Sequence, residues 1–316
     1  MRPKTLFAAV AMICLAGMTS CNEEYSDNTT KNEQQPVAVL FHANIAGIQT
    51  KATDTDWAQG DAIGICALNH GSLTPANFNA KYETESGDLY FAPATDDDAI
   101  YYSTNADEKL DFVAYYPYRK PSSAPDGPAT SDQPTTLTWN TEDQSNLPQI
   151  DLMAAKANNA TNGYNREYSD VALAFNHLLS KVVLNVTLAD NVGTVGSFNV
   201  TIKQINCIQT FDILQGKLVG EPVSMTDVAF HDNSTSTTKS YEAILIPQQY
   251  SGDVEFEVTD KTLNPSPTFT WQIQKLDLLP GNEYRYNITI TRKGVSATAT
   301  INPWVTGSTG TGTATN

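Results

Sequence analysis

PVAVLFHANI, residues 36–45, places an apolar side chain at every second position: Val37, Val39, Phe41, Ala43 and Ile45. A period of two is typical of a β-strand with one face in the core and the other toward solvent. His42 falls on the opposite face from Phe41. No stretch from residue 36 onward has the period of an amphipathic helix. We therefore expect an all-β protein.

Short apolar-rich runs recur along the chain, and Gly, Pro, Asn and Asp separate them. The predicted strands are residues 62–68, 110–116, 137–139, 171–175, 181–188, 198–208, 241–246, 254–258, 269–273 and 284–291. Many short strands with turn residues between them indicate β-sandwiches.

Two long loops divide these strands. Residues 117–135 carry five prolines, which no regular element tolerates, and residues 140–168 hold few strand formers. We expect an N-terminal β-sandwich domain over residues 36–165 and a C-terminal one over residues 166–306. The Gly- and Thr-rich residues 307–316 are expected to form a disordered tail.

Residues 1–20 have the layout of a secretory signal peptide. Arg2 and Lys4 precede an apolar run that is too short to span a bilayer, and small residues lead to Cys21. This layout resembles a bacterial lipobox, which implies that Cys21 is the lipidation site and the mature N-terminus. The alternative is an ordinary cleaved signal followed by a coincidental cysteine.

Residues 21–35 are polar and acidic, and they predict a lipidated flexible tether. Glu23 and Glu24 resemble the acidic surface-export signal of Bacteroidetes lipoproteins. We expect the chain at the cell outer membrane, lipid-anchored and exposed at the surface.

Composition excludes several classes of protein. The net charge of −16 argues against a nucleic-acid partner, because phosphate binding needs clustered Lys and Arg. Cys66 and Cys207 lie in apolar runs, which favours buried thiols over a disulfide. No Cys-x-x-Cys pair supports a structural zinc site.

No catalytic motif is present. His177 lies between apolar runs and is expected to be packed and hydrogen-bonded, and the chain has neither a G-x-S-x-G nor an H-E-x-x-H motif. The run Asp96-Asp97-Asp98 lacks the spacing of a calcium loop, so a solvated turn is favoured. We predict a protein that is not an enzyme and has no cofactor and no metal site.

Tyrosines are frequent, and they have two interpretations. Surface aromatic rings can stack on sugars, whereas aromatic residues on strands are also ordinary core and edge residues. The tyrosines in question are Tyr101, Tyr102, Tyr115, Tyr116 and Tyr118.

TKATDTDWAQGDAIGI, residues 50–65, resembles a signature of the fimbrillin-like lipoproteins of Bacteroidetes, in which a basic residue precedes W-x-x-G-D-x-I-G-I. Further matching segments are DLMAAKA (151–157), VALAFNHLLSKVVLNV (171–186), AILIPQQ (243–249), LLPGNEYRYNITI (278–290) and INPW (301–304). The resemblance implies two tandem transthyretin-like (Greek-key) β-sandwiches and assembly into surface fimbriae, the type V pili.

The resemblance also implies that a trypsin-like protease cuts at a basic residue after the first strand, and the equivalent residue is Lys51. The family usually has Arg there, and a solvent-exposed lysine beside a turn is the alternative. Removal of residues 36–48 would leave a groove that a strand from a neighbouring subunit can fill. Burial of the five apolar side chains of such a strand would contribute about 8–15 kcal/mol of gross hydrophobic free energy.

The predicted function is therefore a structural subunit of surface fimbriae, in a tip or accessory position, because the tail lacks the apolar alternation of a donor strand. The alternatives are a surface glycan-binding lipoprotein and a fimbrial anchor that is not cleaved. The expected partners are other fimbrial subunits, the outer membrane before processing, and a host or glycan receptor.

Overall fold

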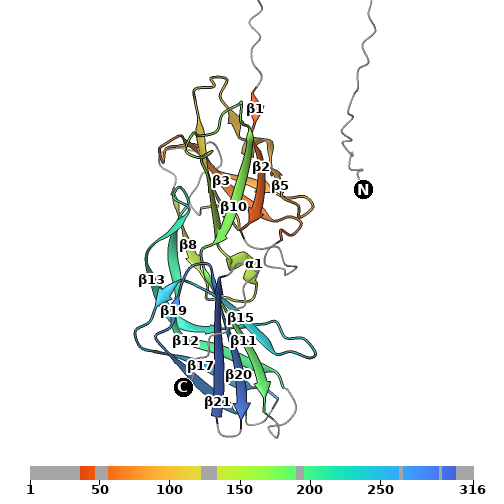
Figure 1. Cartoon of the computed structure of the whole chain (residues 1–316), viewed down its shortest axis with the longest axis vertical. Helices are drawn as coiled ribbons and strands as arrows, with labels where there is room; N and C mark the ends of the chain where they lie inside the picture. Colours follow the sequence, from red (N-terminus) through yellow and green to blue (C-terminus); the bar gives the residue numbers. More distant parts are fainter. Residues whose placement is uncertain are drawn as a thin grey trace, which may run out of the picture. The chain divides into compact units, whose positions relative to one another are not determined.

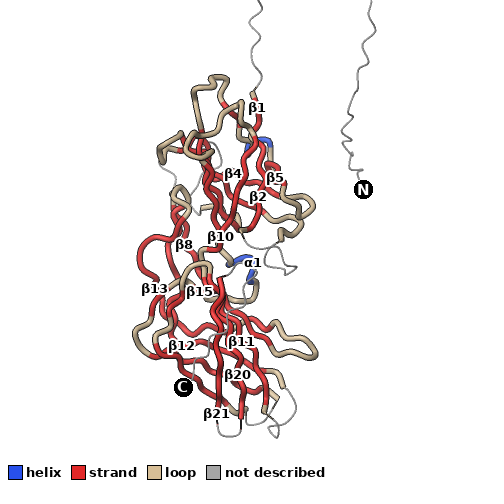
Figure 2. The backbone as a smooth tube through the Cα atoms, in the orientation of Figure 1, coloured by secondary structure: helices blue, strands red, loops and turns tan. Residues whose placement is uncertain are grey.

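The structure, a computed structural model, describes residues 36–46, 56–121, 134–189, 196–262, 266–291 and 294–303. Cys21, Lys51, the signal, the tether and the tail lie outside these residues. Strands dominate the described chain (Figure 2), as the period-two pattern predicts. The helices described are a 3-10 turn, Asp96–Asp98, and α1, Leu147–Ile150. Neither is long and apolar enough to cross a membrane.

Seven strands of the N-terminal half pair in a closed ring, in the order β10-β2-β5-β4-β3-β7-β9. Their bounds are β2 Leu40–Ile45, β3 Ala62–Asn69, β4 Pro75–Glu83, β5 Tyr90–Pro93, β7 Leu110–Tyr116, β9 Met153–Ala157 and β10 Asp170–His177. β1 (Val37–Ala38) pairs with β6 (Tyr101–Tyr102). β5 pairs with both β2 and β4, and β10 pairs with both β2 and β9. These two strands close the edges that an open sandwich would leave unpaired.

The C-terminal half is a sandwich of two five-stranded sheets, β14-β15-β11-β20-β21 and β13-β12-β17-β18 with β8 added on β12 (Figure 1). Its longer strands are β8 Thr136–Asn140, β11 Ser180–Leu188, β12 Phe198–Asp212, β13 Lys217–Ala229, β15 Ser240–Leu245, β17 Asp253–Asp260, β18 Thr268–Gln274, β20 Asn282–Thr291 and β21 Gly294–Pro303. The short ones are β14 His231–Asp232, β16 Gln248–Gln249 and β19 Asp277–Leu278. One core cluster, which includes Phe256 and Trp271, fills the space between the sheets.

The strand groups do not separate at residues 165/166 as expected. β10 belongs to the N-terminal ring, whereas β8, which precedes it in the chain, pairs with β12 of the C-terminal sheet. The expected boundary therefore assigns both strands to the wrong half. Loop composition could not reveal this, since it carries no information about which strands pair.

A buried cluster joins the two halves. It contains Tyr115 from β7, Trp139 from β8 and Phe211 from β12. The Trp139 Nε1–H donates to the carbonyl oxygen of Ile150 at 2.8 Å. The Arg119 guanidinium lies 3.6 Å from the centre of the Trp139 ring system. The two halves thus share a core instead of being connected by a free linker.

Both cysteines of the described chain are free and buried, as predicted. Burial raises the pKa of the Cys66 thiol to about 12 and that of Cys207 to about 11. Because the thiolate is the reactive form, neither side chain should react with iodoacetamide in the native protein at mildly alkaline pH. Peptide mass spectrometry should find both alkylated after unfolding in guanidinium chloride. Rapid native modification of Cys66 would contradict this burial.

Candidate functional site

The candidate functional site is the slot that holds β2. On one side β2 pairs in parallel with β10, from Leu40↔Asp170 to Ile45↔Phe175. On the other side it pairs antiparallel with β5 through Phe41↔Phe91 and His42↔Tyr90, and the Ala43 amide donates to the Leu89 carbonyl at 2.7 Å. β2 is therefore an inner strand with hydrogen-bonded neighbours on both edges.

The inward face of β2 carries the side chains predicted from the alternation. Val39, Phe41 and Ala43 are buried, whereas Leu40 is 60% exposed. The Phe41 ring makes edge-to-face contacts with Tyr82 at 5.0 Å and Phe112 at 5.2 Å between ring centres. Aromatic pairs of this geometry add to the free energy of area burial.

The burial is smaller than the sequence alone suggested. Val39, which directly precedes β2, and Phe41 are the large side chains of this segment that are buried, and they contribute about 3–6 kcal/mol of gross hydrophobic free energy. Val37 and Ile45 are only partly buried against the core. The expected total of about 8–15 kcal/mol was too high, because it treated all five positions as fully buried.

Trp57 lies just after the connection that follows β2, and its side chain contacts this strand. Its side chain is buried, and its ring meets Phe91, Tyr116 and Phe175 edge-to-face at 5.1–5.3 Å. The Trp57 Nε1–H donates to the carbonyl oxygen of Ala43, in the middle of β2, at 2.8 Å. The tryptophan of the W-x-x-G-D segment is thus a direct contact of the first strand.

The next residues of the same segment form a hydrogen-bonded turn. Gly60 has φ +84°, a conformation that favours glycine. Asp61 accepts the Ala58 amide at 2.7 Å and the Tyr116 hydroxyl at 3.0 Å. Burial raises the pKa of the Tyr116 hydroxyl, and the Asp61 carboxylate raises it further, so Tyr116 stays a protonated donor. This turn orients Trp57 toward the slot.

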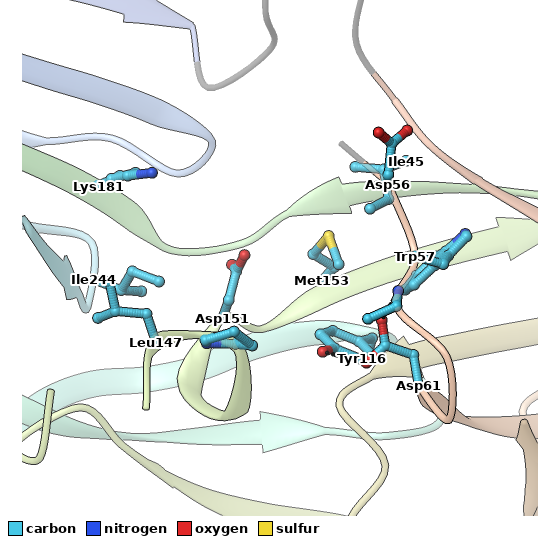
Figure 3. A pocket seen from close by; sticks show the side chains of 12 residues that line it. Ile45, Asp56, Trp57, Asp61, Tyr116, Leu147, Asp151, Met153, Lys181 and Ile244 are labelled. Atoms are coloured by element: carbon cyan, nitrogen blue, oxygen red, sulfur yellow. Dashed lines mark hydrogen bonds between the residues drawn. The ribbon is translucent and has the colours of Figure 1, made fainter. Parts of the chain in front are cut away.

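A hollow of about 120 Å³ lies at the end of β2 (Figure 3). Ile45, Asp56, Trp57, Tyr116 and Met153 are among the residues that line it. Ile45 and Asp56 flank residues 47–55, which include the predicted processing residue Lys51. Lys51 and the predicted lipidation residue Cys21 stay predictions, because both lie outside the described residues.

The remaining singled-out residues have structural partners. His177 is buried and its Nδ1 lies 2.9 Å from Asp151 Oδ1, so it is packed and hydrogen-bonded as predicted. His42 lies on the outward face, with Nδ1 2.8 Å from Asp170 Oδ1. In the 3-10 turn, Asp98 accepts the Lys81 amide at 2.9 Å. No group of metal-ligating side chains occurs within the described ranges.

Some of the singled-out tyrosines are core residues, and another is exposed as a sugar-stacking ring would be. Tyr102, Tyr115 and Tyr116 are buried, while Tyr101 is 52% exposed. Sequence reasoning missed the slot partners Tyr82 and Phe91, because β4 and β5 were not predicted. A weak signal was present in β4, where Ala80 and Tyr82 alternate.

Comparisons with known proteins agree with this architecture. The profile of the fimbrillin-like family matches residues 50–304, and the chain belongs to that family. A Bacteroides uniformis protein named as a candidate fimbrium subunit, Fim1C, is 29% identical over an alignment of 319 residues, which covers 96% of this chain and 95% of that protein.

Two solved structures have the same fold. A candidate cell adhesion protein of Bacteroides uniformis superposes with a TM-score of 0.68 at 25% identity, covering 85% of this chain and 98% of that one. One from Bacteroides ovatus superposes with a TM-score of 0.67 at 21% identity, covering 87% and 100%.

Proposed function

We propose that this protein is a structural subunit of surface fimbriae, the type V pili, that is exported as a lipoprotein and joined to a neighbour by strand exchange. Family membership and the fimbrium subunit among its relatives support the assembly role. The single observation that carries the mechanism is the two-sided pairing of β2. In the same proposal both halves are transthyretin-like β-sandwiches, and in the N-terminal one β5 and β10 close the two edges.

Two-sided pairing determines what the loss of β2 would leave behind. Without β2, both β10 and β5 would present unpaired backbone donors and acceptors. An incoming strand parallel to β10 would satisfy both sets, and apolar residues at alternate positions would take the places of Val39, Phe41 and Ala43. Main-chain bonds then supply affinity, and the side chains set the register.

The same pairing has a consequence for the order of events. Cleavage after Lys51 cuts one covalent connection but breaks no hydrogen bond of β2. We therefore propose that the severed strand stays in its slot until a neighbour's strand displaces it, so the hydrophobic slot is never fully exposed to water.

A tip or accessory position is supported by the other end of the chain. β21 pairs along its whole length with β20, from Gly294↔Thr291 to Pro303↔Asn282. Ala297 and Ala299 of β21 pack against the C-terminal core. This strand is committed to its own sheet, and the following residues are mostly Gly, Ser and Thr. Such a subunit would accept a strand without donating one.

A Lys51→Gln variant tests the proposal, with Lys51→Arg as the matched control. In fimbriae sheared from cells, the unmodified protein and Lys51→Arg should begin at residue 52. Lys51→Gln should keep Cys21 at its N-terminus and stay with the membrane fraction. Mass spectrometry of the N-terminal peptide makes the distinction. An assembled form that still begins at Cys21 contradicts strand removal.

The uncleaved anchor and the glycan-binding lipoprotein are the competing functions. Electron microscopy of cells that lack the protein separates them from subunit assembly. Shortened or missing fimbriae support assembly, whereas unchanged fimbriae with lost glycan retention support a binding role. If the protein is an uncleaved anchor, cells that lack it should form fimbriae that detach from the cell.

A further inference from the structure

A second hollow, of about 580 Å³, lies apart from the β2 slot. Asn69 at the end of β3 and Asn77 near the start of β4 line it, and β6 contributes Tyr101. The segment before β7 adds Asp107 and Glu108. Its volume is in the range of pockets that bind small molecules, about 300–1,000 Å³.

Tyr101 gives this hollow an aromatic surface. Its neighbour Tyr102 is buried and contacts Phe112 at 6.4 Å between ring centres, which anchors β6 to the core. Tyr101 itself is 52% exposed. β1 pairs with β6 through Ala38↔Tyr101, so the segment that begins the first strand also holds this tyrosine in place.

The walls are held by backbone and side-chain hydrogen bonds. Asp111 accepts the Gly71 amide at 3.0 Å, and its other oxygen lies 2.8 Å from His70 Nδ1. The His70 amide donates to the Lys109 carbonyl at 3.0 Å, and the Asn69 amide donates to Thr74 at 2.9 Å. A site with fixed walls loses little conformational entropy when a ligand binds.

The polar groups in the hollow are suited to hydroxyl groups. Within the described chain, the side-chain amides of Asn69 and Asn77 make no hydrogen bond, and each offers two donors and an acceptor. The carboxylates of Asp107 and Glu108 add acceptors. Planar groups that both donate and accept, next to an aromatic ring, match a sugar with its apolar C–H face and its ring of hydroxyls.

Charge narrows the class of ligand. The hollow carries Asp107 and Glu108 against a single cation, Lys109, on a chain of net charge −16. Anionic ligands are therefore disfavoured by repulsion. The described residues hold no group that could bind a metal ion, so a metal-bridged anion is not supported either.

We propose that this hollow binds the end of a neutral oligosaccharide. The Tyr101 ring stacks on the apolar face of a sugar ring. Asn69 and Asn77 hydrogen-bond its hydroxyls from one side, and Asp107 and Glu108 accept from the other. Because β1 still pairs with β6 in the uncleaved chain, binding is measured on that form and does not depend on whether the protein assembles.

The test is isothermal titration of the full chain with neutral oligosaccharides that end in glucose, galactose, mannose or N-acetylglucosamine, and with sialylated ones of the same length. At least one neutral ligand should bind, and the sialylated ones should bind more weakly. Tyr101→Ala should weaken binding about tenfold, while Tyr101→Phe should stay within about twofold. Asn77→Ala is an independent second variant and should weaken binding about tenfold.

Tyr90→Ala is the matched control, because Tyr90 lies on β5, outside the lining of the hollow, and is 71% exposed. It should leave binding unchanged. Three outcomes would overturn the proposal: no neutral ligand binds at millimolar concentration, sialylated ligands bind more tightly, or Tyr101→Ala and Asn77→Ala bind like the unmodified protein.

Discussion

Replacement of Trp57 by alanine is expected to lower the free energy of unfolding by about 3–5 kcal/mol. The substitution removes a buried ring with three aromatic contacts, to Phe91, Tyr116 and Phe175. It also removes the Nε1–H that donates to the Ala43 carbonyl. Ala43 is fully buried in β2, so its carbonyl oxygen would have no water to replace that donor. Guanidinium chloride unfolding followed by circular dichroism measures the change.

Trp57→Phe separates packing from hydrogen bonding. It keeps an aromatic ring in the slot and loses only the indole donor and part of the area, so we expect a loss of about 1–2 kcal/mol. A loss below about 1 kcal/mol for Trp57→Ala would show that this residue does not fasten β2. The hydrogen-exchange rates of the β2 backbone amides should rise in Trp57→Ala, and they report on this strand directly.

Glu242→Ala is expected to cost about 3 kcal/mol, the lower end of the range for breaking a buried ion pair. The Lys181 Nζ lies 3.2 Å from Glu242 Oε2, and the two side chains are only 6% and 14% exposed. Glu242 also accepts a hydrogen bond from the Asn233 side chain at 3.1 Å. Its removal leaves a largely buried ammonium without this carboxylate, in the sheet that supports the C-terminal core.

Two variants serve as controls for the ion pair. Asp227→Ala removes an exposed carboxylate 2.7 Å from Lys203 Nζ and should cost less than about 1 kcal/mol. The double variant Lys181→Met/Glu242→Leu replaces both charges with apolar groups and should recover most of the stability, because neither charge then needs desolvation. Equal losses for Glu242→Ala and Asp227→Ala would contradict a buried pair.

Individual strands show where sequence reasoning succeeds. In β17, Val254, Phe256 and Val258 are buried, whereas Glu255 and Glu257 remain partly exposed, so the alternation directly predicts the strand and its inward face. β7 has the predicted bounds, Leu110–Tyr116. β17 has one face against the core, which is the condition under which a period of two appears. β7 is buried on both faces, and it is found instead from its continuous apolar run, Phe112–Tyr116.

The strands that the sequence did not predict lack a regular alternation of buried apolar and exposed polar residues. β13 is an edge strand on which Val223 and Met225 are 55% and 58% exposed, so its apolar residues do not alternate with burial. In β4 the register shifts where it pairs with β3, and Asn79 has φ +52°, which interrupts the alternation. Irregularities of this kind depend on the neighbouring strand and not on the local residue types.

The slot was only partly predictable. The alternation of Val39, Phe41 and Ala43 marks the inward face of the first strand in the sequence alone. Its fastening by Trp57 and the aromatic contacts of Phe41 involve side chains from β4, β5 and β7, which the chain brings together only on folding. Residue types gave no indication of these partners.

By itself, the order of apolar and polar residues determined that this is an all-β chain and which face of the opening strand turns inward, because the two-residue period is a property of local backbone geometry. Only the tertiary structure decided which strands are neighbours. β2 lies beside β10, with the contact between His42 and Asp170 spanning 128 residues, and β8 joins β12 across the expected boundary. Pairing over such distances depends on how all the side chains fill a common core, which no local pattern encodes.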